Sequence, residues 1–210
     1  MRLIGYYNYT VILTNLSLVS SVFGIYMAMR GRVEGAVYCL MLSGFCDMFD
    51  GKVARTKERC EDERRFGIQL DSLSDLVCFG VLPTVIGYSI GMTNKFYVIV
   101  FFLYVMAALT RLAYFNVMEE ERQSQTPDRR KEYIGLPVTS VAFIIPLIYI
   151  LGKFIELEFN KVYGIGLLII AFAFVLNFRV KKPGKIASLI MILIGIAEII
   201  CMILGFHYGG

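Results

Sequence analysis

Four aspartates lie in and beside segments that are apolar enough to sit within a lipid bilayer. Asp47 and Asp50 belong to the pattern D-x-x-D-G-x-x-A-R, while Asp71 and Asp75 belong to the pattern G-x-x-x-D-x-x-x-D that follows it. Residues three or four apart share one face of a helix, so each pattern places its two acids on a single stripe. Two antiparallel helices joined by the loop 56–66 can turn these stripes toward each other, so that the four carboxylates converge.

Converging carboxylates predict bound cations. Four such groups repel one another strongly at low dielectric unless cations or protons lie among them. Donor sets made only of oxygen suit hard divalent ions such as Mg2+, Mn2+ or Ca2+. A structural salt bridge can explain a single intramembrane acid, but four acids in register on two successive helices indicate a functional site.

Small residues share the acidic stripes. Gly51, Ala54 and Gly67 would let a bulky ligand approach the backbone between the two helices. Arg55 offers a planar positive group to a phosphate or to one of the acids. Because Mg2+ is commonly held by a few carboxylates together with substrate phosphates, this stretch predicts a site for divalent cations and a phosphate-bearing ligand.

The elements that position these residues are predicted to be membrane helices. Of the 210 residues, 57% are hydrophobic and only 18% are charged, which is too apolar for a water-soluble domain of this size. Apolar runs recur along the whole chain, so we predict one all-α integral membrane domain over residues 1–210. A spanning helix needs about 20 residues, and the candidate spans are 9–29, 33–56, 68–91, 96–118, 135–154, 161–178 and 186–206.

The basic residues predict the orientation in the membrane. Most of the 21 lysines and arginines fall in the loops after the second, fourth and sixth spans. These loops should therefore be cytoplasmic, and the acids lie near them. The net charge of +4 then reflects topology and attraction to anionic lipid, with no need for a nucleic-acid partner. The single histidine, His207, argues against a histidine-based metal site or catalytic triad.

The aspartate patterns resemble the signature of the CDP-alcohol phosphatidyltransferases. Every fixed position of that signature is filled in "DMFDGKVAR" and "GIQLDSLSD", although the linker between the two halves is longer than is usual in the family. The stretches "LDSLSDLVCFGVLP", "RLAYFNV" (111–117) and "YIGLPVTS" (133–140) are similar to those of the bacterial and archaeal serine-transferring branch, the phosphatidylserine synthases. Val138 and Thr139 depart from the commoner continuation of the last stretch.

The resemblance implies an architecture. It predicts a core of six transmembrane helices over about residues 9–180, with 186–206 as an additional C-terminal hydrophobic helix. It further implies a homodimer in the plasma membrane of a prokaryotic cell, with the active site facing the cytoplasm.

The resemblance also implies a reaction. Asp47, Asp50 and Asp71 would hold two divalent cations, Mg2+ or Mn2+, while Asp75 would share one cation and act as the catalytic general base. The substrates would be CDP-diacylglycerol and L-serine, with CMP as the leaving group. The residues implied to contact the nucleotide and the diphosphate are Gly51, Ala54, Arg55 and Gly67.

The acceptor site is open to more than one interpretation. The serine carboxylate calls for an arginine or amide donor, and Arg111 and Asn116 are the candidates. Arg111 could instead extend to the interface or pair with a structural carboxylate, and Asn116 could be structural. Ser17 and Ser20 of the first span either face the pocket or bond within their own helix.

Three alternatives to serine transfer remain at this stage. Glycerol-phosphate or inositol-phosphate acceptors would need several basic groups, whereas the acceptor region offers chiefly Arg111. A divalent-cation transporter would place its carboxylates near the middle of the membrane, with polar residues on both sides.

Overall fold

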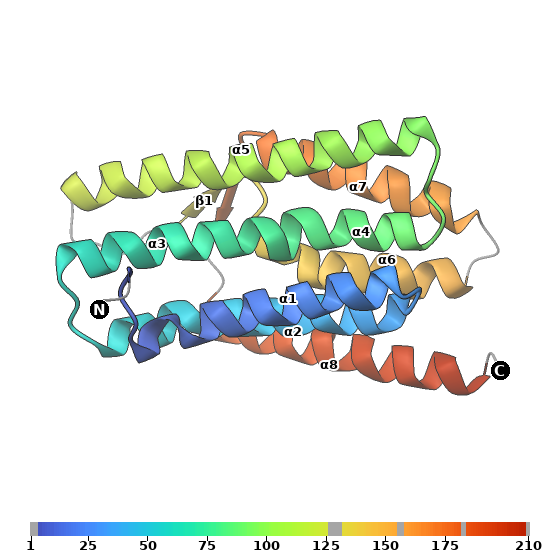
Figure 1. Ribbon diagram of the computed structural model, residues 1–210, viewed down its shortest axis with the longest axis horizontal. Helices are drawn as coiled ribbons and strands as arrows, with labels where there is room; N and C mark the ends of the chain where they lie inside the picture. The colour runs from blue at the N-terminus through green and yellow to red at the C-terminus, as the bar shows by residue number, and fades with distance from the viewer. Residues whose placement is uncertain (1–3, 126–131, 155–157, 182–183, 209–210) are drawn as a thin grey trace.

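The chain folds into a bundle of helices that run along one common axis (Figure 1). The structure is a computed structural model that describes residues 4–125, 132–154, 158–181 and 184–208. In chain order its elements are η1 (Tyr9–Val11), α1 (Ile12–Met29), α2 (Val33–Val53), η2 (Ala54–Thr56), α3 (Glu61–Asp75), η3 (Leu76–Val81), α4 (Leu82–Ser89), α5 (Lys95–Gln125), β1 (Glu132–Ile134), η4 (Val138–Ser140), α6 (Val141–Phe154), α7 (Phe159–Val175), β2 (Arg179–Lys181) and α8 (Lys185–Tyr208).

Several of these helices can cross a membrane. Among the described residues, three helical stretches are both long and apolar enough, namely Tyr9–Met29, Glu61–Ser89 and Lys95–Arg122. Shorter apolar helices cover Val138–Gly152, Phe159–Val175 and Leu189–Leu204. These features agree with the predicted all-α membrane class, whereas the number of spans stays a prediction. The short antiparallel ribbon of β1 and β2 was not predicted.

The third, fourth and fifth predicted spans differ from the helices that the structure shows. The third helix begins at Glu61, not at residue 68, because acidic residues in its first turn complement the positive end of the helix dipole. It continues through η3 and α4 to Ser89 as one rod (Figure 1). The fourth helix, α5, extends beyond residue 118 to Gln125. The fifth span was predicted from residue 135, whereas η4 begins at Val138 and α6 at Val141.

A π-helical segment follows the last aspartate. Residues Leu76–Val81 adopt this wider winding directly after Asp75. The buried hydroxyl of Tyr104 on α5 donates a 2.7 Å hydrogen bond to the carbonyl of Phe79 within the segment. Segments of this kind are common at functional sites, and this one joins α3 to α4.

Hydroxyl groups join α1 to α2. Ser17 donates to the carbonyl of Ser43 at 3.2 Å, and Ser20 donates to the carbonyl of Cys39 at 2.9 Å. Both serines therefore bond to α2, and neither belongs to the described wall of the cavity beside the acids. The sequence had suggested that they face a pocket or bond within their own helix. Interhelical bonds from small residues are typical of close packing within membranes.

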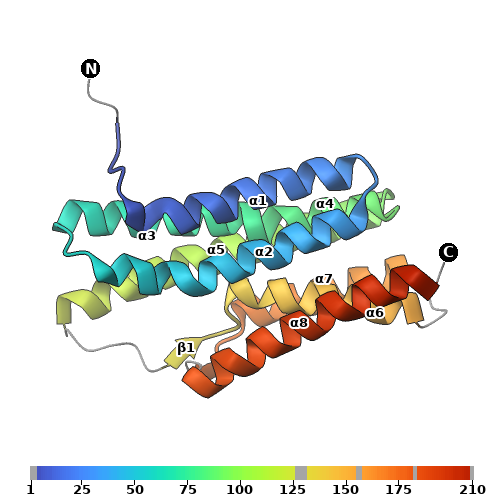
Figure 2. The ribbon, with the colours of Figure 1, turned by 90° about the horizontal axis from the view of Figure 1, so that it is seen from below.

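The C-terminal helix covers one side of the bundle. α8 packs against α6 and also reaches α2 (Figure 2). Its buried or half-buried positions include Met191, Gly195, Glu198 and Met202, which lie on one face. This face brings Met191 to the cavity described below.

Candidate functional site

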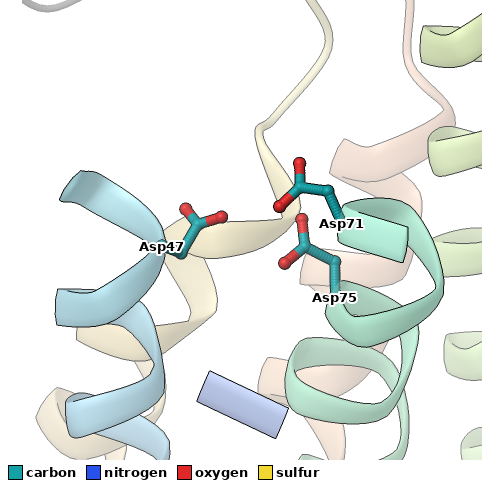
Figure 3. Close-up of side chains that lie close together, drawn as sticks. All are labelled: Asp47, Asp71 and Asp75. Carbon is teal, nitrogen blue, oxygen red and sulfur yellow. The ribbon is translucent and has the colours of Figure 1, made fainter. Parts of the chain in front are cut away.

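Three of the four aspartates meet between α2 and α3. Asp47 projects from α2 toward Asp71 and Asp75 on α3 (Figure 3). One carboxylate oxygen from each of the three lies within 4.8 Å of the others. The predicted convergence of the acidic stripes is thus observed, because the helical spacing places Asp71 and Asp75 on one face and the antiparallel pair turns that face toward Asp47.

The fourth acid stands beside this group. Asp50 is 9% exposed and accepts a 3.3 Å hydrogen bond from the hydroxyl of Thr14 on α1. It lines the same cavity as the other three acids. Of the two acids on α3, Asp75 is the more deeply buried, with 8% of its surface exposed.

The donor set fits a hard divalent cation. All donors are carboxylate oxygens, and their mutual separations are those of groups that can share one ion with oxygen ligands at about 2.0–2.6 Å. Burial of several acids side by side is otherwise unfavourable, because like charges in a poorly solvated site repel strongly. The acidic cluster is therefore suited to metal binding.

The acids open into a cavity of about 380 Å³. Besides the four aspartates, its wall comprises Gly44, Met48, Gly51, Lys52, Arg111, Leu112, Phe115, Pro137, Val138, Thr139, Ser140, Phe143 and Met191. One side is acidic and hydrophilic, and the other is formed by apolar side chains of α5, α6 and α8. Such a cavity suits a ligand that has both a charged group and an apolar part.

The glycines of the signature have different surroundings. Gly51 lines the cavity and has open space around the position of a Cβ atom. Gly67 and Ala54 do not belong to the described cavity wall. A Cβ atom on Gly67 would lie 3.0 Å from Nη1 of Arg59, so the guanidinium of Arg59 covers this glycine. Arg55 belongs to η2, but its side chain lies outside the described residues.

Arg111 is buried in the cavity wall. Only 6% of its surface is exposed, so it does not extend to the interface as one interpretation of the sequence allowed. Its Nε donates a 3.2 Å hydrogen bond to the carbonyl of Leu136, and its guanidinium lies 5.6 Å from the ring centre of Phe115.

Asn116 occupies a different place from Arg111. Its side-chain oxygen accepts a 2.9 Å hydrogen bond from Ser72 and so ties α5 to α3. It is not part of the described cavity wall. The contact lies between Asp71 and Asp75 along α3, so the place of Asn116 is beside the acidic stripe.

Several contributors to the site were missed from the sequence. Thr14, which supports Asp50, lies on one face of α1 with Ser17 and Ser21, and this period of three and four was a usable signal. No comparable signal points to Phe143 or Met191, since apolar residues fill every membrane helix.

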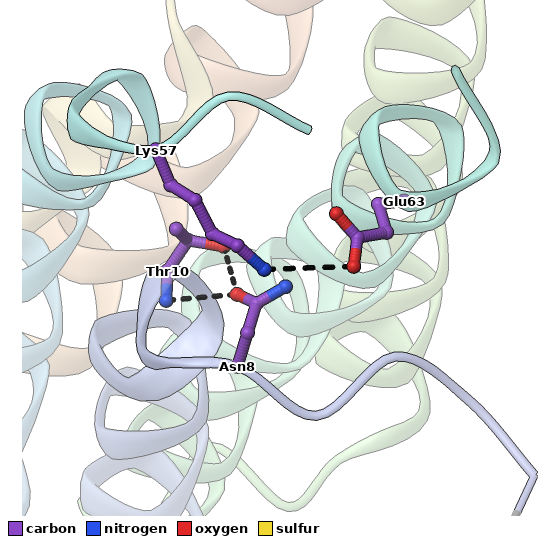
Figure 4. A network of polar contacts seen from close by, with 4 residues as sticks. All are labelled: Asn8, Thr10, Lys57 and Glu63. Carbon is purple, nitrogen blue, oxygen red and sulfur yellow. Dashed lines mark hydrogen bonds and ion pairs between the residues drawn. The ribbon is translucent and has the colours of Figure 1, made fainter. Parts of the chain in front are cut away.

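The loop between the aspartate helices is held by the N-terminal segment. Asn8 accepts hydrogen bonds from the amide and the hydroxyl of Thr10, and nearby Lys57 pairs with Glu63 of α3 at 3.6 Å (Figure 4). The hydroxyl of Tyr9 also lies 3.0 Å from that of Thr56. The Tyr9–Thr56 contact joins the N-terminal segment to the end of α2, and the Lys57–Glu63 pair joins the linker to the start of α3.

The arrangement agrees with comparisons to known proteins. The family model for CDP-alcohol phosphatidyltransferase matches residues 7–205, so the chain belongs to this family. The match includes nearly all of α8. With its apolar helices, the chain is an integral membrane protein of a family that uses divalent cations.

Several curated relatives are named for transfer to serine. The chain is 33% identical over 150 residues to the CDP-diacylglycerol–serine O-phosphatidyltransferase of Saccharomyces cerevisiae, covering 67% of this chain and 53% of the relative. It is 31% identical over 148 residues to the archaetidylserine synthase of Methanothermobacter thermautotrophicus, covering 70% and 60%. A Helicobacter pylori CDP-diacylglycerol–serine O-phosphatidyltransferase is 29% identical over 184 residues, covering 82% and 73%. The chain thus spans little more than half the length of the first two.

Proposed function

We propose that this protein transfers the phosphatidyl group of CDP-diacylglycerol to the hydroxyl of L-serine and releases CMP, as a phosphatidylserine synthase does. The observation that carries the proposal is one cavity in which the four aspartates of the family signature face a buried arginine. The names of the relatives favour serine as the acceptor.

The basic groups of the cavity also favour serine over a phosphorylated acceptor. The described cavity wall contains two basic residues, Lys52 and Arg111. Lys52 is exposed, and its ammonium lies 4.7 Å from the ring centre of Phe49 on the same helix. A phosphate dianion would be better matched by a cluster of basic groups, whereas a single carboxylate is well matched by one guanidinium.

The aspartates have distinct roles in the proposed reaction. Asp47, Asp50 and Asp71, with Asp75 sharing, would hold two divalent cations, Mg2+ or Mn2+. When bound, these supply charge neutralisation and alignment of the diphosphate. Asp75 accepts the proton of the serine hydroxyl, whose oxygen attacks the phosphorus on the lipid side. The new serine–phosphorus bond replaces the bond to CMP, which leaves with the electron pair. The base has to lie about 2.6–3.2 Å from the hydroxyl oxygen.

The nucleotide site is proposed to lie at the glycine side of the acids. Open space at Gly51 supports contact with the CDP group there. We assign Ala54, Arg55 and Gly67 to the same subsite on the basis of the signature, with Arg59 beside Gly67. The apolar wall from α5, α6 and α8 would receive the part of the lipid next to its phosphate.

The setting of the enzyme is part of the proposal. Residues 1–210 form one membrane-embedded domain with α8 added to a core of six spans, and the chain acts as a homodimer in a prokaryotic plasma membrane. The basic loops near the acids support a cytoplasmic active site. Arg111 would bind the acceptor serine by direct contact. Asn116 would contribute to the same subsite through its position beside the acidic stripe.

An acceptor assay tests the proposal. Purified protein is incubated with CDP-diacylglycerol, Mg2+ or Mn2+, and L-serine, glycerol 3-phosphate or inositol phosphate in turn, and CMP release is measured. Release with serine alone is the expected result. CMP release only with a phosphorylated acceptor would show that this compound, and not serine, is the acceptor. No CMP release with any acceptor would reject the transferase assignment. The Asp75→Asn variant serves as the inactive control.

A further inference from the structure

The backbone at Gly135 and Leu136 holds the arginine of the cavity. We propose that this segment positions the guanidinium of Arg111 for the carboxylate of the acceptor amino acid, so that Gly135 is a specificity-determining positioning residue. The inference rests on the proposed function, because it takes an amino acid as the acceptor.

The contact between Arg111 and Leu136 fixes the direction of the guanidinium. The bond runs from Nε to the carbonyl of Leu136 at 3.2 Å. Nε is the nitrogen nearest the alkyl stem, so this bond orients the plane of the whole guanidinium group. The ring of Phe115, 5.6 Å from the guanidinium carbon and one turn further along α5, gives a second contact.

The carbonyl of Leu136 is itself held by the end of α7. The amide of Gly135 donates to the carbonyl of Phe178 at 2.7 Å, and the amide of Leu136 donates to that of Ala173 at 3.2 Å. Ile134, just before them, pairs with Arg179 in the β1–β2 ribbon. The segment is therefore anchored by three successive residues to the end of α7 and to β2, which holds the carbonyl of Leu136 in place.

Residue 135 has a backbone conformation and a close environment that favour glycine. Its φ angle is +74°, a left-handed conformation that side chains other than Asn and Asp rarely adopt. A Cβ atom there would lie 3.1 Å from the carbonyl oxygens of Phe174 and Leu176 and 3.4 Å from Nε of Arg111. The same glycine thus allows the turn and the close approach of the arginine. A side chain at this position would move the arginine, the loop or both.

This geometry predicts a selective kinetic effect. A hydrogen bond to a charged group contributes substantially to the free energy of binding. Misdirecting the guanidinium should therefore raise KM for serine about ten- to a hundredfold. KM for CDP-diacylglycerol should stay within about twofold, because the acids and Gly51 lie on other helices. Serinol, which has the amine and hydroxyls but no carboxylate, should show no change in KM.

The test is a double-mutant cycle with Gly135→Ala and Arg111→Met. The matched control is Gly31→Ala, since Gly31 has a φ angle of +72° but no atom within 4 Å of a Cβ position, in the distant α1–α2 turn. We expect Gly135→Ala to raise KM for serine in the wild-type background and to have no further effect in the Arg111→Met background. Gly31→Ala should leave the serine KM unchanged.

Other outcomes would overturn the inference. An equal rise of both substrate KM values, an equal effect on serinol, or an additive effect with Arg111→Met would make Gly135 merely structural. If Gly135→Ala does not fold, Gly135→Asn brings the same Cβ with less backbone strain, and the same criteria apply to it. No CMP release by the wild-type protein with serine would reject the proposed function itself, whereas an active wild-type enzyme without the predicted coupling would reject this inference alone.

Discussion

Helix α2 approaches α6 closely at Gly44, which lines the cavity with the acids. A Cβ atom on Gly44 would lie 2.2 Å from the Cβ atom of Ala142 on α6. Carbon atoms in contact lie about 3.5–4.0 Å apart, so Gly44→Ala would force the helices apart by roughly 1.3 Å or more. Because Gly44 precedes Asp47 by one turn and both line the cavity, this movement shifts Asp47 relative to the acids of α3.

The expected effect of Gly44→Ala is larger on activity than on stability. Overpacking lowers the free energy of unfolding by about 1–3 kcal/mol, and the better helix propensity of alanine restores about 0.5–1 kcal/mol of it. A displacement of about 1 Å in a catalytic site can lower the rate about a hundredfold. We therefore expect a loss of about that size in the rate of CMP release, with only a modest fall in the thermal unfolding midpoint in detergent.

Adding Ala142→Gly tests whether the contact with Ala142 causes the loss of activity. In Gly44→Ala with Ala142→Gly the nearest remaining atom is the Cα of residue 142, 3.8 Å away, which is an ordinary contact. This double variant should recover most of the activity. Gly24→Ala is the matched control, since its Cβ would lie 2.8 Å from that of Cys39 but away from the cavity. A fully active Gly44→Ala protein, or a double variant as inactive as the single one, would refute this reasoning.

Four further predictions concern the site and its support. Asp75→Asn should lower turnover by about 10²–10⁴-fold while binding of CDP-diacylglycerol persists; retained turnover would remove the base assignment. Excess chelator should abolish CMP release without changing the circular dichroism spectrum, and added Mg2+ or Mn2+ should restore it; activity that persists in chelator would contradict the metal assignment. Tyr104→Phe leaves the buried carbonyl of Phe79 without its 2.7 Å bond and should lower stability by about 1–3 kcal/mol, measured as the unfolding midpoint, whereas an unchanged midpoint would show that the π segment does not need this bond. Gly67→Ala should displace the flexible end of Arg59 at little cost in stability but raise KM for CDP-diacylglycerol several-fold, and an unchanged KM would exclude Gly67 from the nucleotide subsite.

The predictions that rested on helical periodicity agree with the structure. The spacing of Asp47, Asp71 and Asp75 defines which face of each helix carries the acids, and the structure brings these faces together. The reason is that the repeat of a helix is fixed by its backbone hydrogen bonds, so residues three or four apart share a face whatever surrounds them.

The predictions that depended on contacts between distant helices were less complete. Arg111 and Asn116 lie only five residues apart on α5, yet one lines the cavity and the other bonds to Ser72. The π segment after Asp75 adds a local change of winding, so the rotation of α4 does not follow from the spacing of the acids.

The sequence alone therefore determined the membrane class, the family and the shared face of the acids, because composition and helical repeat are local properties of the chain. Tertiary structure alone decided that Arg111 bonds to the carbonyl of Leu136, that Arg59 covers Gly67, and that α8 contributes to the cavity. These features arise from the packing of segments far apart in the chain, where side-chain shape and close backbone approach set the distances and leave no periodic pattern in the sequence.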